Sequence, residues 1–137
     1  MNYFRVRTIK HLLEHKKGYL FLAVFWTLFI AYLCLTDFNK LPNIKIGGLD
    51  KSVHFILHFF FTLFWYLYLS SMKSSKKNLI LYVFIASVLY GSLIEIAQGL
   101  FTTTRKADVL DVFANSIGAV LASLAIHLKL YFFKRVD

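Results

Sequence analysis

The sequence predicts an all-α protein, an integral membrane bundle of four transmembrane helices. Hydrophobic residues make up 58% of the 137 residues and aromatic residues 18%, above the roughly 45–50% apolar content of soluble domains. Four nearly uncharged runs each approach the length of about 20 residues that a helix needs to cross a bilayer. No run alternates polar and apolar residues over the length of a strand, so a β-barrel is not expected.

The basic residues lie in short clusters between the apolar runs. A formal charge of +9 could indicate binding to nucleic acid, but this clustering is typical of membrane flanks. We therefore predict a lipid bilayer as the partner and no nucleic acid. The one cysteine, Cys34, lies inside an apolar run, so neither a disulfide nor a Cys-based metal motif is available. We expect a packed thiol.

Residues 1–17 form a basic leader, which we place in the cytoplasm as a short interfacial helix. A four-helix membrane domain follows over residues 18–133. Its first span, residues 18–35, has no small-residue cleavage site at its end, so we expect a retained helix rather than a signal peptide.

Polar connections separate the other spans. Pro42, Gly47 and Gly48 predict a loop over 37–51, and a basic turn covers 70–78. A short polar connection covers 102–107. The remaining spans are predicted at about 53–72, 79–101 and 110–133.

The distribution of Lys and Arg predicts the orientation of the four spans. Eleven of these residues lie in the leader, the 70–78 turn and the C-terminal end, against five in the other two connections. By the positive-inside rule, both termini are cytoplasmic and the 37–51 and 102–107 connections lie outside.

Polar side chains gather at the predicted outer ends of three spans. Charged groups inside a span cost about 2–3 kcal/mol on insertion scales, so by default they indicate a functional site. Carboxylates and polar groups at helix ends have a second explanation as caps, flank charges or interhelical hydrogen bonds, and we keep it open, above all for Asp50 and Asp108. The expected substrate-binding residues are Asp50, Lys51, His54, Glu95, Gln98, Arg105, Asp108, Asp111 and Asn115.

Residue spacing predicts that these groups share interior helix faces. Asp50, His54 and His58 are each four residues apart, which places them on one stripe. On the fourth span Asp108, Asp111 and Asn115 are three and four residues apart, and Gly118 and Ala122 continue this spacing. We expect this pair of small residues to pack closely against a neighbouring helix. His58 itself we expect to be a packing residue.

Three segments of the sequence resemble the VanZ-like family of small bacterial membrane proteins. They are D-K-S-V-H at 50–54, E-I-A-Q at 95–98 and R-K-A-D-V-L-D-V-F-A-N-S-I-G at 105–118. The resemblance implies a bacterial cytoplasmic (inner) membrane location, a role in the cell envelope and an association with resistance to the glycopeptide teicoplanin. It also selects the site residues named above together with Gly118. His58 and Ala122 depart from the family pattern.

Three functional hypotheses follow. The first is a site that binds an envelope molecule, either a lipid-linked precursor or a glycopeptide-type amphiphile, with Lys51 and Arg105 holding an anionic group. The second is a membrane-embedded enzyme with His54, Glu95 and Asp111 as catalytic candidates. The third is a non-catalytic partner of other membrane proteins. No cofactor is predicted; Asp108, Asp111, Glu95 and His54 could hold a divalent metal, but no specific motif supports one. The oligomeric state stays open.

Overall fold

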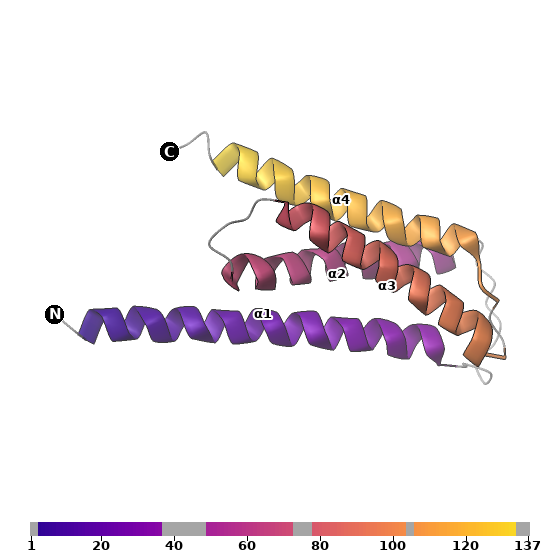
Figure 1. The fold of residues 1–137 in the computed structure, drawn as a ribbon, viewed down its shortest axis with the longest axis horizontal. Coiled ribbons are helices and arrows are strands. Elements are labelled where there is room, and N and C mark those ends of the chain that lie inside the picture. Colours follow the sequence, from indigo (N-terminus) through magenta and orange to yellow (C-terminus); the bar gives the residue numbers. More distant parts are fainter. Residues whose placement is uncertain (1–2, 37–48, 73–77, 104–105, 134–137) are drawn as a thin grey trace.

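The computed structural model describes residues 3–36, 49–72, 78–103 and 106–133, with side chains from His15 onward except those of Leu49 and Phe133. Within these ranges it consists of helices and their ends, without a strand, and the all-α prediction is confirmed. The helices are α1 (Tyr3–Leu35), α2 (Leu49–Met72), α3 (Leu79–Phe101) and α4 (Val109–Phe133) (Figure 1).

All four helices are long and apolar enough to cross a membrane, over His15–Leu35, Asp50–Met72, Leu79–Phe101 and Val109–Phe132. The basic leader is not a separate helix, because α1 runs from Tyr3 through Gly18 without a break. A single glycine in a helix costs only about 1 kcal/mol relative to alanine, which the helix-forming residues on both sides offset. The second helix begins at Leu49 rather than near 53, so Asp50 and Lys51 lie in its first turn.

The helices run alternately up and down (Figure 1). We call the end that carries both termini the proximal end, and the opposite end the distal end. At the distal end α1 and α3 finish while α2 and α4 begin. The most extensive interface is between α2 and α4, whereas α1 packs on α2 and α3.

Small residues bring the backbones of α2 and α4 into contact. A Cβ atom added at Gly118 would clash with the carbonyl oxygen of Phe55 and lie 3.1 Å from the backbone nitrogen of Phe59. Ala119 and Ala122 are completely buried. The α2–α4 interface therefore has room for hydrogen at Gly118 but not for a side chain, as in other closely packed membrane helices.

Two apolar clusters hold the rest of the bundle. The first joins α1, α2 and α3 through Ile30, Cys34, Leu57, Phe61 and Ile94. The second, which we call the proximal apolar cluster, joins α2, α3 and α4 through Tyr66, Leu79, Val83 and Ile126. Hydrogen bonds add to the attachment of α1: Trp26 Nε1 donates to Leu57 O over 2.9 Å. Cys34 is buried and forms no disulfide, as expected of a packed thiol.

Candidate functional site

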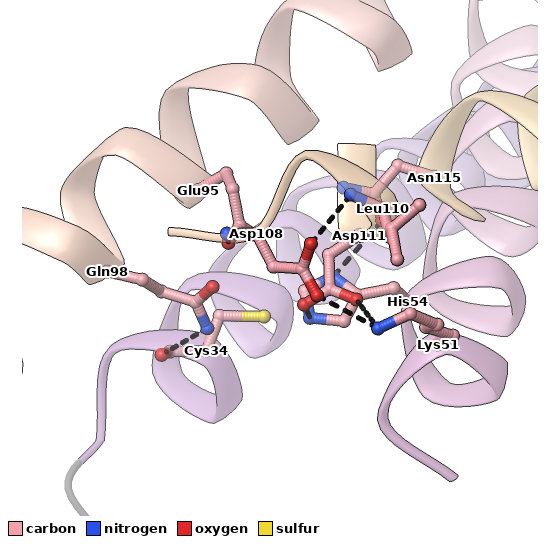
Figure 2. A network of polar contacts seen from close by, with 9 residues as sticks. All are labelled: Cys34, Lys51, His54, Glu95, Gln98, Asp108, Leu110, Asp111 and Asn115. Carbon is pink, nitrogen blue, oxygen red and sulfur yellow. Dashed lines mark hydrogen bonds and ion pairs between the residues drawn. The ribbon is translucent and has the colours of Figure 1, made fainter. Parts of the chain in front are cut away.

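Polar side chains fill the distal space between α2, α3 and α4. Four of them are almost completely buried, with exposed fractions of 2% for His54, 4% for Glu95 and Asp111, and 1% for Asn115. Figure 2 shows them meeting from three helices. Together with two half-exposed residues they form what we call the distal polar cluster: Lys51, His54, Glu95, Asp108, Asp111 and Asn115.

Lys51 links the beginnings of α2 and α4. Its Nζ lies 2.9 Å from Asp108 Oδ2 and 3.4 Å from Asp111 Oδ1. The side chains of Lys51 and Asp108 are 40% and 41% exposed, whereas that of Asp111 is 5% exposed. An ion pair exposed to this extent contributes little to stability. Its effect is geometric, because it fixes the first turns of two helices side by side.

The start of α4 is capped twice. Asp108 Oδ1 accepts the N–H of Leu110 over 2.8 Å, and Glu95 Oε1 on α3 accepts the N–H of Asp108 over 2.6 Å. The connection from α3 folds back this closely because Gly99 has no side chain; a Cβ there would lie 3.1 Å from Ala107 Cβ. The capping explanation for Asp108 is therefore correct, and the same carboxylate also pairs with Lys51.

Two groups lower the pKa of Asp108 below its usual value. The larger contribution comes from the Leu110 backbone N–H and the next from the hydrogen bond to the Lys51 ammonium. Both favour the ionised carboxylate. Asp108 is thus negatively charged throughout the neutral pH range.

His54 is held from both sides by side chains of α4. Its Nδ1 lies 3.2 Å from Asn115 Oδ1 and its Nε2 lies 3.8 Å from Asp111 Oδ2. An amide oxygen only accepts hydrogen bonds, so Nδ1 carries the proton in this arrangement. The Nε2 of a neutral His54 then directs a lone pair toward a carboxylate, which suits a proton or a cation between them.

A potential metal-ligand set includes this histidine. One ligand atom each from Asp50, His54 and Asp111 lie within 4.8 Å of one another. Nitrogen and carboxylate ligands suit a divalent transition metal such as Zn²⁺. The set differs from the sequence expectation, which combined His54 and Asp111 with two other residues. Those two have other contacts, since Asp108 pairs with Lys51 and Glu95 accepts the Asp108 N–H.

Three of the expected site residues are not among the six that form the distal polar cluster. Asp50 lies beside the cluster, with a ligand atom within 4.8 Å of those of His54 and Asp111. Gln98 is 2% exposed, but its Nε2 donates to Cys34 O over 2.8 Å. Figure 2 shows it turned toward Cys34, so it joins α3 to α1 as an interhelical hydrogen bond. Arg105 lies outside the described residues, and its role stays a prediction.

Buried polar residues that the sequence analysis did not assign to the site lie deeper in the bundle. His58 Nδ1 lies 2.9 Å from Ser87 Oγ, and Thr62 Oγ1 donates to His58 O over 2.9 Å. The four-residue spacing from His54 was the available signal for His58. Thr62 continues the same four-residue spacing, whereas Ser87 had no signal, since single hydroxyl residues are common in membrane helices.

The sequence model of the VanZ/LLP1 family matches residues 4–130. No curated protein and no solved structure matches the chain. The matched region reaches into all four helices and contains the whole distal polar cluster.

Proposed function

The chain belongs to the VanZ/LLP1 family, and on that premise we propose that its distal polar cluster binds a molecule of the cell envelope. The protein is a multi-pass membrane protein with four apolar helices. The proposed ligand is an amphiphile, either a lipid-linked precursor or a compound of the glycopeptide type. Binding of such a ligand would allow the protein to contribute to glycopeptide resistance, the property that the name VanZ implies.

The observation that carries the proposal is the position of the polar groups beside lipid-facing surface. The distal polar cluster lies where membrane-length helices begin and end. Large apolar side chains at the end of α3 and the start of α4 are exposed near it. The exposed fractions are 71% for Leu100, 78% for Phe101, 70% for Val109 and 60% for Phe113. An amphiphile could place its head group among the polar side chains and its hydrocarbon along these surfaces.

The charges of the distal polar cluster favour a particular kind of head group. Lys51, which we expected to hold an anionic group, is already paired with Asp108 and Asp111. Among the described residues the carboxylates outnumber this cation, with Asp50 close by as a further acid. The site therefore favours hydroxyl and amine groups, such as those of sugars and amino sugars, which donate hydrogen bonds to carboxylates.

The orientation belongs to the same proposal. With both termini in the cytoplasm, the distal polar cluster faces the extracytoplasmic side, where envelope precursors and glycopeptides meet the membrane. A reporter enzyme that is active only outside the cytoplasm should then be active when it is fused after Pro42. If this fusion is inactive while the same reporter is active when fused at Asp137, the orientation is excluded.

A susceptibility assay tests the link to resistance. The chain is expressed in a teicoplanin-sensitive bacterium, and the inhibitory concentration is compared among wild type, Asp111→Asn and the lipid-facing control Phe21→Ala at equal membrane levels. We expect wild type and the control to raise the inhibitory concentration and D111N to lose the effect. If wild type leaves susceptibility unchanged, the resistance role is wrong.

A second candidate function is a membrane-embedded enzyme that uses a metal or acid–base chemistry on an envelope substrate. The set Asp50, His54 and Asp111 favours it, because Asn115 holds the ring of His54 through Nδ1 while Nε2 lies 3.8 Å from Asp111 Oδ2. In metal sites the second ring nitrogen of a histidine is commonly held in this way. Stoichiometric Zn²⁺ or Mn²⁺ in purified wild type, absent from Asp111→Ala, would favour this candidate over simple binding.

A further inference from the structure

The contact between His54 and Asp111 brings two electron-pair donors face to face inside the distal polar cluster. Asn115 Oδ1 accepts from His54 Nδ1, so the lone pair of the neutral ring is on Nε2. Nε2 lies 3.8 Å from Asp111 Oδ2, which is farther than a hydrogen bond. Two ligands of one tetrahedral Zn²⁺ ion are about 3.4 Å apart. The two atoms therefore have nearly the separation of ligands that share a cation.

Asp50 can supply a third ligand from the aqueous side. It is exposed, and one of its oxygens lies within 4.8 Å of the ligand atoms of His54 and Asp111. Opposite ligands of one ion are about 4.2–4.4 Å apart, so a small movement of this exposed side chain brings all three within reach of one ion. Three protein ligands leave a fourth position of Zn²⁺ open. An oxygen atom of a ligand head group can occupy that position.

A further buried carboxylate next to this set has one oxygen without a donor. Glu95 is 4% exposed. Its Oε1 accepts the N–H of Asp108, whereas its Oε2 has no hydrogen-bond partner among the described residues. Electrostatic interactions link Glu95 to Asp111 and to His54. An unsatisfied buried carboxylate oxygen is costly, and positive charge brought by an ion offsets that cost. Glu95 thus adds a second, independent reason for a cation at this position.

Lys51 is the cation that Asp111 already contacts. Its Nζ lies 3.4 Å from Asp111 Oδ1 but only 2.9 Å from Asp108 Oδ2, so the contact with Asp111 is the weaker of the two. The Lys51 side chain is 40% exposed. It can therefore move away from Asp111 and keep Asp108 as its partner. The two oxygens of Asp111 face different groups, because Oδ1 faces the ammonium and Oδ2 faces His54.

We propose that Asp50, His54 and Asp111 bind a divalent transition-metal ion and that Lys51 competes with this ion for Asp111. The ammonium balances the carboxylate when no ion is bound. When an ion is bound, the two cations share one carboxylate and lie within about 8 Å of each other, a distance over which salt screens their repulsion only in part. The inference rests on the proposed function, because it assigns the ion to the same cluster and gives the head group a metal to bind.

Binding of Zn²⁺ to the full chain in lipid nanodiscs, without a histidine tag, tests the proposal. Competition with a chromogenic chelator gives the number of ions per chain and the Kd. Wild type should bind one ion per chain, and Asp111→Asn should lose it. Lys51→Met removes the like charge beside the ion and should bind Zn²⁺ about tenfold more tightly. Lys17→Met removes the same charge from an exposed position on α1 and should leave the Kd unchanged.

The tighter binding by K51M is the decisive result, because a misfolded variant does not gain affinity. Asn115→Leu removes the acceptor that orients His54 and should weaken binding about 10–100-fold. The proposal is refuted if wild type does not bind one ion per chain, if D111N binds as wild type does, or if folded K51M binds no more tightly than wild type. Zn²⁺ is the only ligand added, so each of these results is separate from whether the cluster binds an envelope amphiphile.

Discussion

The helices α2, α3 and α4 enclose two interiors of opposite chemistry. The proximal interior contains the proximal apolar cluster, in which Leu79 and Val83 are 1% and 2% exposed. The distal interior contains His54, Glu95, Asp111 and Asn115, all at most 4% exposed. Both are made by the same three helices at comparable burial, so the difference lies in the side chains and not in the architecture.

The comparison separates residues that pack the helices together from polar residues that are candidates for ligand binding. Lipid tails are as apolar as the helix surfaces, so the hydrophobic effect does not drive helix association in a membrane. Close packing of small residues can drive it instead. Gly118 provides such packing against the α2 backbone, Ala122 is completely buried one turn further along α4, and the proximal apolar cluster contains no charged residue. The three helices therefore pack at the proximal end without buried charge, and the distal carboxylates, which cap α4 and pair with Lys51, act at the end where we propose the binding site.

The largest expected effect comes from the α2–α4 interface, on which both interiors depend. Gly118→Ala places a methyl group against the backbone of Phe55 and should destabilise the protein by about 1–3 kcal/mol, the range for overpacking. Thermal unfolding in detergent, followed by tryptophan fluorescence, measures the loss. Gly18→Ala is the matched control, and equal behaviour of the two variants would contradict the close packing.

A smaller effect is expected from Glu95, whose carboxylate caps α4 from α3. Glu95→Ala leaves the part-buried N–H of Asp108 without its acceptor, a loss of about 1 kcal/mol for a typical hydrogen bond. Glu95→Gln keeps an acceptor oxygen and should lose less. Amide hydrogen exchange should show the start of α4 opening in E95A while its proximal end stays protected. Uniform loss of protection along α4 would mean that Glu95 supports the whole bundle.

The smallest expected effect is the dependence of the distal end on pH. Because the pKa of Asp108 is lowered in the folded protein, its contribution is complete above the unfolded value of about 3.9 and is lost as the pH falls through the folded pKa. Protection of the amides at the start of α4, measured relative to the intrinsic exchange rate at each pH, should therefore fall below about pH 4, and Asp108→Asn should weaken this response. An identical acid response in D108N would assign the effect to other groups.

The parts of the structure that depend on single helices were predictable from the sequence. The length of an apolar run determines whether it can cross the membrane as a helix. For α3 the predicted bounds, 79–101, are those of the structure. The spacing of Asp111 and Asn115 placed both on one face of α4. Contacts between helices were harder, because they depend on which helices are neighbours. Gln98 lies three residues after Glu95 but points to α1, and the pairing of His58 with Ser87 requires the register of α2 against α3.

Native mass spectrometry of the protein released from bacterial membranes in mild detergent tests the central claim most directly. Wild type should retain an envelope amphiphile that Asp111→Asn has lost. Ser123→Ala, which removes a hydroxyl without a hydrogen-bond partner outside the distal polar cluster, should retain it. If folded wild type and D111N carry the same bound molecules, or neither carries any, the distal polar cluster is not a binding site for such a ligand.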